Sequence, residues 1–318
     1  MAVVEFTKVT SDQKVSSTLS IRHVLFPTDF SPTSEAALPY AVAICRRFRS
    51  TLHLAHVLSD AGLLMMTGGV DYVSMGTIYE DAQNEANDKL EKISAHFETI
   101  PHHSYIRHGS VWKGLADVIE ANEMDMIVVG THGRTGLGKL LLGSVAEDIL
   151  RHAPCPVLTV GPKLSGRAKL RGLQNESRDL APVDLEMRQI LIATNFASSA
   201  PKLAQVAASI ADEFHAHLTL MHVMEDYNGL GENQEAIETN LHKLRELIPK
   251  HAELQYLPDT LLEFGHAADR ILEAAREREA DIIVLGARTH ADVGTTRLPS
   301  AAHHVIAHAH CPVLTVRG

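Results

Sequence analysis

Three glycines and a serine that follow one apolar strand could together hold a phosphate group. Residues 127–129 form an apolar run that leads into Gly130 and Gly133, and Gly143 and Ser144 come after an intervening loop. Glycine has no Cβ, so backbone N–H groups beside it can approach an anion closely. A helix that begins at Ser144 would direct its unpaired N–H groups and the positive end of its dipole to the same place. This spacing indicates a nucleotide-binding loop.

The same loop comes close to a second phosphate-binding pattern, the P-loop of many ATPases, over residues 133–139. A P-loop needs a serine or threonine directly after its lysine to bind Mg²⁺, and Leu140 stands there. We therefore do not interpret the segment as a P-loop. Arg134 and Lys139 are expected to form a solvated pair near the outer phosphates, and His132 is expected to shape the loop.

Composition and charge narrow the class of protein. The chain has 318 residues, 45% of them hydrophobic and 21% charged, which is ordinary for a globular protein of two domains. No apolar run approaches the roughly 20 residues that span a bilayer, and residues 1–20 lack the apolar core of a secretory signal. We expect a cytoplasmic protein without membrane contact. A net charge of −10 argues against a nucleic-acid-binding surface.

Cysteine and histidine do not form a recognisable catalytic or metal-binding pattern. The chain has three cysteines, Cys45, Cys155 and Cys311. That count is too low for a disulfide framework, and we expect small buried thiols. His304 and His308 have the spacing of one helix face, but no acidic or cysteine partner completes a metal site around them. We predict no catalytic residue and no metal ligand set.

The second half of the chain repeats the first. Residues 155–160 recur without change as 311–316, and residues 22–30 align with 188–196. The first half is longer because of an insertion at 60–80, which is rich in methionine and glycine and would form a lid over the site or pack at the domain interface. Self-similarity of this length predicts two tandem domains.

Each half alternates short β-rich runs with longer helical patterns, an order that predicts a parallel sheet with helices on both faces. In the first half the strands are expected at 23–26, 51–57, 104–107, 126–129 and 157–160, and the helices at 33–47, 80–97, 111–122 and 144–151. Ser31 followed by Pro32 indicates one helix start, and Ser144 with Glu147 resembles a capping box.

These features together resemble the universal stress protein family. The resemblance is carried by the glycine spacing, by Pro27-Thr28-Asp29 at the end of the first strand, by His56-Val57 at the end of the second, and by the run 155–160. It covers nearly the whole chain. It implies two tandem α/β domains, each a five-stranded parallel sheet of the adenine-nucleotide α-hydrolase-like type with ATP at the carboxyl ends of the strands. The two halves are expected to pair through their last strands.

The resemblance also implies roles for individual residues on the base and ribose side. Asp29, with Pro27 and Thr28 before it, would contact ribose or a phosphate-bound Mg²⁺. Val57 would offer backbone groups to adenine, and Gly130 would pass beneath the ribose. An alternative for Asp29 taken alone is that it caps the next helix.

On the phosphate side, the resemblance places Gly133, Gly143, Ser144 and Val145 around the phosphates. Ser144 would give its hydroxyl, and the amides near Ser144 and Val145 would give their N–H groups. The alternative for Ser144 taken alone is that it caps its own helix.

The second half departs from this pattern. Asn195 replaces the aspartate, Thr289 stands at the second glycine, and Pro299 takes the position of Gly143, while Ser300 is retained. Proline has no N–H to donate, so phosphate binding should be impaired there. We expect one working site, in the first half.

The expected organisation is therefore a flexible tail at 1–20, a nucleotide-binding domain at 21–161, a linker at 162–186 and a degenerate domain at 187–318. The leading hypothesis is a stress-response protein that binds ATP or a related adenine nucleotide and regulates partners according to occupancy. An enzyme with slow ATPase or autophosphorylating activity and a scaffold without nucleotide remain alternatives. An intrachain pseudo-dimer is expected, and a homodimer of chains is also conceivable; the protein partner is not specified by the sequence.

Overall fold

The computed structural model describes residues 20–59, 72–97, 99–131, 142–161, 185–225, 234–250, 254–287 and 300–317. The strands of the first half are β1 (His23–Pro27), β2 (Thr51–Leu58), β3 (His102–His108), β4 (Met126–Gly130) and β5 (Val157–Val160). Its helices are α1 (Pro32–Glu35), α2 (Leu38–Phe48), α4 (Tyr72–Ser94), α5 (Val111–Ala121) and α6 (Ser144–His152).

The second half has the same order of elements. Its strands are β6 (Gln189–Ala193), β7 (His217–Met224), β8 (Asp259–Phe264), β9 (Ile282–Ala287) and β10 (Val313–Arg317). Its helices are α7 (Ala200–Phe214), α8 (Gln234–Glu246), α9 (Ala267–Glu277) and α10 (Ser300–His308).

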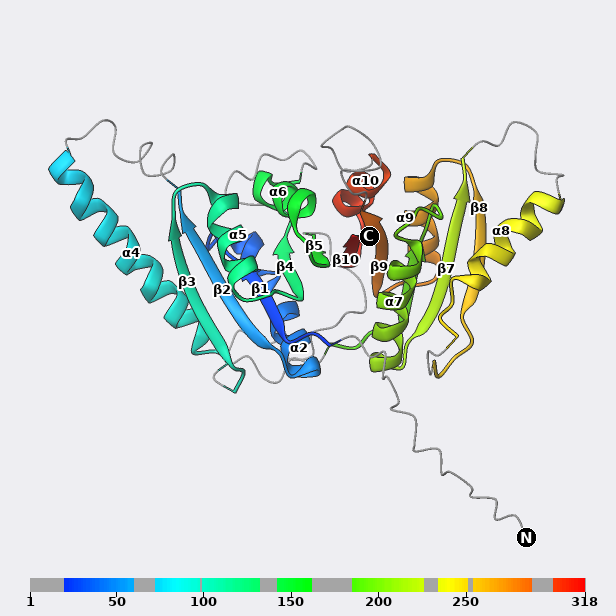
Figure 1. Ribbon diagram of the computed structural model, residues 1–318, viewed down its shortest axis with the longest axis horizontal. Helices are drawn as coiled ribbons and strands as arrows, with labels where there is room; N and C mark the ends of the chain where they lie inside the picture. The colour runs from blue at the N-terminus through cyan, green and yellow to red at the C-terminus, as the bar shows by residue number, and fades with distance from the viewer. Residues whose placement is uncertain are drawn as a thin grey trace, which may run out of the picture.

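The ten strands in the described residues form one continuous sheet, in the order β3-β2-β1-β4-β5-β10-β9-β6-β7-β8 (Figure 1). Strands within each half pair in parallel, and β5 and β10 join the halves in antiparallel orientation. The expected α/β class and the pairing through the last strands are confirmed. The feature that the repeat alone did not specify is that the two five-stranded halves merge into a single sheet.

Threonine side chains reinforce the junction of the halves. The hydroxyl of Thr159 donates to the carbonyl oxygen of Val313 at 2.9 Å, and the hydroxyl of Thr315 donates to that of Val157 at 3.3 Å. Both threonines are buried. Because the repeated run places the same residue type on both strands, each contributes a similar bond, and the junction is close to symmetric.

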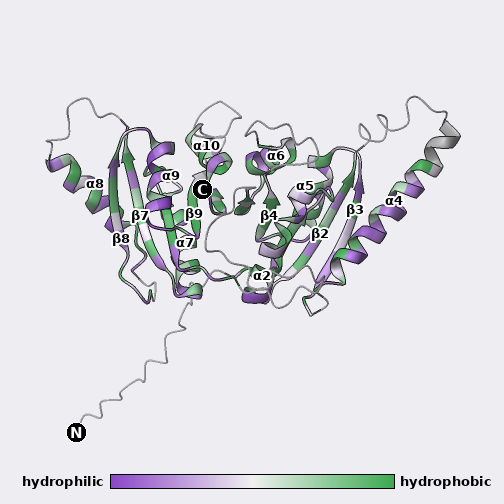
Figure 2. Cartoon of the chain, turned by 180° about the vertical axis from the view of Figure 1, so that it is seen from behind, coloured by the Kyte–Doolittle hydropathy of each residue, from purple (hydrophilic) through white to green (hydrophobic). Residues whose placement is uncertain are grey.

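One hydrophobic core lies on each face of the sheet, and each core crosses the junction. Residues of α2, α4, α7 and α8 pack on one face, whereas α5, α6, α9 and α10 pack on the other. Figure 2 shows hydrophobic residues along the strands at the centre of the sheet, as expected for parallel strands covered on both faces, whereas β3 at the edge is more hydrophilic. The two halves are thus held together by shared cores as well as by strand pairing.

Two helices differ from their expected bounds by more than one residue. The helix expected at 33–47 is broken into α1 and α2 at Ala36 and Ala37. Pro39 explains the break, because proline lacks an N–H and is tolerated only in the first turn of a helix, which is where α2 has it. The helix expected to begin at Glu80 begins at Tyr72 instead, so the last part of the expected insertion is helical. Residues 60–71 of that insertion, and 162–184 of the expected linker, lie outside the described residues.

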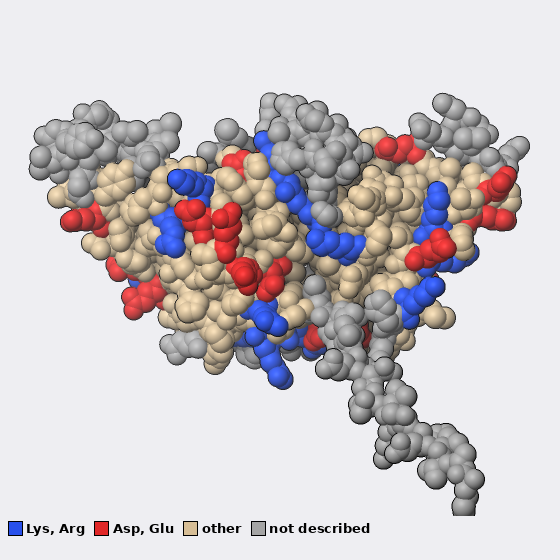
Figure 3. Space-filling view, viewed as in Figure 1, with Lys and Arg blue, Asp and Glu red and all other residues tan. Residues whose placement is uncertain are grey.

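Charged side chains of both signs are spread over the face shown in Figure 3, and one short run of basic side chains crosses its middle. None of the described helices combines the length and the hydropathy needed to cross a membrane.

Candidate functional site

A hollow of about 210 Å³ opens at the carboxyl ends of β1, β2 and β4, beside the start of α6. Because β1 has β2 on one side and β4 on the other, the hollow lies where the strand order reverses, the usual ligand position in open α/β sheets. Its lining residues are Pro27, Thr28, Asp29, Ser34, Ala55, His56, Val57, Val111, Leu115, Val129, Gly130, Gly143, Ser144, Val145 and Ala146. Eight of the eleven expected site residues are therefore brought together here.

The turn after β1 is fixed by side-chain hydrogen bonds. The hydroxyl of Thr28 accepts the N–H of Phe30 at 2.9 Å, and Oδ1 of Asp29 accepts the N–H of Ser31 at 3.0 Å. Phe30 has a φ of 61°, a left-handed conformation that is uncommon for a bulky residue and is held here by its surroundings. Asp29 therefore supports the turn before α1 and lines the hollow. The cap of α1 is Ser31, whose hydroxyl accepts the N–H of Ser34 at 3.2 Å, so the suggested capping role of Asp29 is wrong. Its contact with ribose or Mg²⁺ stays a prediction.

His56 holds this turn against β2, a role that the sequence analysis did not assign. Its Nδ1 donates to the carbonyl oxygen of Thr28 at 2.8 Å, and its ring lies 4.4 Å from the ring of Phe30 between centroids. The side chain is buried and lines the hollow beside Val57. The recurrence of the same histidine as His222 was the signal in the sequence.

Gly130 is required by the close approach of α1 to β4. A Cβ atom at this position would lie 2.6 Å from the carbonyl oxygen of Thr33, closer than real Cβ atoms come to backbone. The expected role of Gly130 beneath the ribose stays a prediction. Glycine is needed here for a structural reason as well, because the absence of a side chain lets the first turn of α1 pack against the end of β4.

The start of α6 differs from the expected capping box. Gly143 occupies the N-cap position, and Ser144 is the first helical residue, with no side-chain bond that caps the helix. Glu147 pairs with Arg151 at 2.7 Å instead of reaching back to the helix start. The proposal that Ser144 caps its own helix is therefore wrong. A glycine at the N-cap satisfies the backbone geometry by itself, and Ser144 is left exposed at the rim of the hollow.

At the start of α6, one backbone N–H group anchors the helix and the next three are left without an acceptor among the described residues. The N–H of Gly143 donates to the carbonyl oxygen of Thr131 at 2.7 Å, which anchors the helix to the end of β4. Within the described part of the chain, the N–H groups of Ser144, Val145 and Ala146 have no acceptor, as expected for a first helical turn. All three residues line the hollow, so the positive end of α6 faces it.

Three expected site residues, His132, Gly133 and Arg134, lie outside the described residues, as does Lys139. Their proximity to the hollow stays a prediction.

The second half has a hollow at the equivalent position. Its volume is about 280 Å³, and its wall includes Thr194, Asn195, Val223 and Gly286. The turn is built in the same way, with Oδ1 of Asn195 accepting the N–H of Ala197 at 3.2 Å. A hollow is thus open beside the turn after the first strand in both halves. Thr289 and Pro299 are outside the described residues, so the expected obstruction of the phosphate end stays a prediction.

The three cysteines are buried thiols, as the sequence indicated. All three cysteines are buried and free, and burial raises the pKa of Cys45, Cys155 and Cys311 to about 12, so the thiols stay protonated at neutral pH. His304 and His308 stack at 4.1 Å between ring centroids. Among the residues with described side chains, no group of histidine, cysteine or acidic residues has the arrangement of a metal site.

Comparison with known proteins decides the family. The profile of the universal stress protein family matches residues 20–161 and again 186–317, which together make up most of the chain. The chain belongs to the universal stress protein family. A universal stress protein of Thermus aquaticus is 36% identical over 135 residues, which is 41% of this chain and 98% of the relative. The two separate matches to the family profile show that this chain carries two such domains in tandem.

Solved structures agree on the fold. A universal stress protein from Archaeoglobus fulgidus aligns with a TM-score of 0.65 and 21% identity, covering 93% of this chain and 98% of its own. Two other members of the family were solved with adenine nucleotides, one with cAMP and one, also from Archaeoglobus fulgidus, with dAMP. These two cover 42% and 41% of this chain, at TM-scores of 0.34 and 0.32.

Proposed function

We propose that the first half binds ATP or a related adenine nucleotide, and that occupancy of this site changes the associations of the protein with its partners. The observation that carries the proposal is the hollow beside Asp29, into which the first-turn N–H groups of α6 are directed. Such a helix start favours a phosphate oxygen, because unpaired N–H groups and the helix dipole act together. The base and ribose would lie nearer to Val57 and Gly130.

The residues of the hollow fit a nucleotide that carries Mg²⁺. Asp29 is the single carboxylate among the described lining residues, and Mg²⁺ in nucleotide sites is usually held by one or two carboxylates, water and the phosphates themselves. Asp29 would then orient the metal and phosphates through its carboxylate, while its bond to Ser31 keeps the turn in place.

The same proposal assigns a different role to the second half. It has a hollow but carries Asn195 in place of the aspartate, and its sequence has Thr289 and Pro299 in the loop. Nucleotide affinity there should be much lower. The second half would then complete the shared sheet and cores as a built-in partner domain. We also propose that the protein works in the cytoplasm, with domains at 21–161 and 187–318.

A nucleotide titration of the full chain tests the proposal. Calorimetry with ATP and Mg²⁺ should give one high-affinity site per chain, and mass spectrometry of protein purified without added ligand should show an adenine nucleotide. Absence of binding to the full chain would favour a scaffold. Steady-state release of phosphate that is lost in the Asp29→Ala variant would instead favour a slow ATPase. Two equivalent sites would contradict the assignment of the second half.

A further inference from the structure

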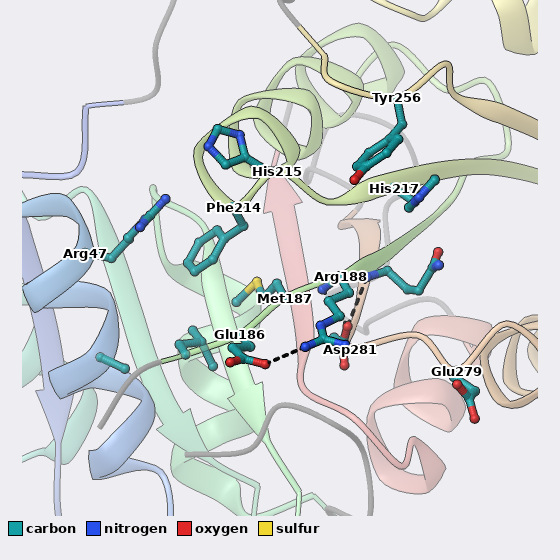
Figure 4. A pocket seen from close by; sticks show the side chains of 13 residues that line it. Arg47, Glu186, Met187, Arg188, Phe214, His215, His217, Tyr256, Glu279 and Asp281 are labelled. Carbon is teal, nitrogen blue, oxygen red and sulfur yellow. Dashed lines mark hydrogen bonds and ion pairs between the residues drawn. The ribbon is translucent and has the colours of Figure 1, made fainter. Parts of the chain in front are cut away.

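A cavity of about 570 Å³ lies where the two halves meet, at the opposite end of the strands from the hollows described above. It borders the amino ends of β6, β7 and β9, through Gln189, His217 and Asp281, whereas the hollow of the second half lies at the carboxyl ends of these strands. Arg47 of α2 contributes a wall from the first half (Figure 4). The size is typical of a site for a small organic ligand.

The acidic side chains of this cavity are engaged by the protein. Asp281 accepts the N–H groups of Arg188 and Gln189 at 2.7 and 2.9 Å, which ties the start of β6 to the start of β9. Glu186 pairs with the guanidinium of Arg188 at 3.1 Å. Glu279 lies at the far end of the cavity from Arg47 in Figure 4. The carboxylates are therefore poorly placed to attract a cation into the middle of the cavity.

Several hydrogen-bond donors are uncommitted. In the part of the chain that the structure describes, the hydroxyl of Tyr256 and the rings of His215 and His217 have no hydrogen-bond partner. Arg188 has five N–H donors, and its bond to Glu186 uses one nitrogen. The guanidinium of Arg188, the hydroxyl of Tyr256 and one nitrogen of each neutral imidazole ring can thus donate to a ligand, and these donors suit a ligand with anionic oxygen atoms.

Aromatic rings supply a flat and apolar part of the wall. The ring of Tyr256 stacks on that of His217, with centroids 3.8 Å apart and planes 15° apart. Phe214 lies beneath the guanidinium of Arg47, which is 5.2 Å from the ring centroid. Arg47 is itself fixed by Glu213, whose carboxylate is 2.9 Å from its Nε, so Arg47 serves mainly to hold Phe214 and to join the halves.

We infer that this cavity binds a small planar aromatic carboxylate. The ring of the ligand would lie against Phe214 and the stacked Tyr256, where aromatic contacts are favourable. Its carboxylate would accept bonds from the free N–H groups of Arg188 and from the hydroxyl of Tyr256, and a guanidinium is well matched to a carboxylate. This site is separate from the nucleotide hollow, because the length of the strands lies between them.

Calorimetry of the full chain with 2-naphthoate tests the inference. Binding should be measurable at millimolar concentration or below, and 2-naphthylmethanol and 2-naphthylmethylamine, which lack the carboxylate, should bind at least about tenfold more weakly. The Arg188→Gln and Tyr256→Ala variants should each lose about fivefold or more in affinity. Both side chains are exposed, so thermal unfolding should change little in these variants.

Two variants serve as matched controls. Arg22 has the position of Arg188 in the first half, and its N–H makes the same 2.7 Å bond, to Asp125, but it does not line the cavity. Arg22→Gln should therefore leave naphthoate binding unchanged, as should Asp29→Asn in the nucleotide hollow. The inference is overturned if naphthoate does not bind, if the alcohol binds equally well, if Arg188→Gln has no effect, or if Asp29→Asn abolishes binding.

Discussion

The Nδ1 atom of His56 lies 2.8 Å from the carbonyl oxygen of Thr28, and the same bond at the same distance joins His222 to Thr194 in the second half. In both halves a histidine from the second strand therefore holds the turn that follows the first strand. Both halves therefore share the hydrogen bond that supports the turn beside the hollow. The two turns differ in charge, because the position of Asp29 in the first half is occupied by Asn195 in the second.

Asp29→Asn should test this difference directly. Asparagine keeps an Oδ1 that can accept the N–H of Ser31, as Asn195 does for Ala197, so the turn should stay intact. Loss of the charge should weaken binding of Mg²⁺-loaded ATP by about tenfold or more, because the proposed site would lose its single carboxylate ligand for Mg²⁺. Calorimetry with and without Mg²⁺ measures the effect. Equal affinities of the variant and the wild type for Mg²⁺-ATP would rule out the proposed role.

Gly143→Pro should weaken both the fold and nucleotide binding. The backbone angles of Gly143, φ −63° and ψ 147°, suit proline, but the bond from its N–H to Thr131 would be lost. We expect a loss of about 1–2 kcal/mol in the free energy of unfolding and a several-fold loss in ATP affinity, since the start of α6 is no longer anchored. Gly143→Ala keeps the N–H and should show neither loss. An unchanged ATP affinity in the proline variant would argue against a role for this helix start.

Gly130→Ala should destabilise the protein more than the equivalent change in the second half. The new Cβ would lie 2.6 Å from the backbone oxygen of Thr33, whereas a Cβ at Gly286 would lie 3.3 Å from Oγ of Ser199, a side chain that can rotate. We expect about 1–3 kcal/mol of destabilisation at Gly130 and less at Gly286. Urea unfolding of both variants gives the comparison. Equal losses would show that the approach of α1 to β4 is not the cause.

Stability should fall in mild acid because of His53. This side chain is buried, with Nε2 3.1 Å from His23 and Nδ1 3.1 Å from the hydroxyl of Tyr105. Burial, together with the charges of His23 and His103, lowers the pKa of His53 to about 4 from its ordinary value of 6.5. The unfolded chain therefore takes up a proton at higher pH than the folded one does. The stabilisation is complete above pH 6.5 and is lost as the pH falls to about 4.

Urea unfolding at several values between pH 7 and pH 4 measures this loss, which should reach up to about 3 kcal/mol from His53. Thr219 occupies the equivalent position in the second half, where it is buried and lies 3.4 Å from Arg278. His53→Thr should accordingly reduce the slope of stability against pH in this range. A variant with the same slope as the wild type would show that the pH dependence comes from other groups.

The sequence by itself determined the repeat, the order of strands and helices, and most residues of the first hollow. Strand positions followed from short apolar runs between turn residues, since that signal is local. The helix starts at Ser31 and Ser144 were located for the same reason, although the capping role of Ser144 was wrong because Gly143 took the N-cap position. The break at Pro39 also has a local cause, because proline is tolerated only in the first turn of a helix.

Only the tertiary structure shows why position 130 must be glycine and which contacts hold the turn beside the first hollow. A repeat predicts two similar domains, but the merging of their sheets depends on the contact of β5 with β10. The need for glycine at position 130 comes from Thr33, and the hold of His56 on Thr28 comes from residues 28 positions apart. The cavity between Arg47 and Tyr256 is made by segments from both halves. Such contacts depend on distances across the fold, which the local order of residue types does not encode.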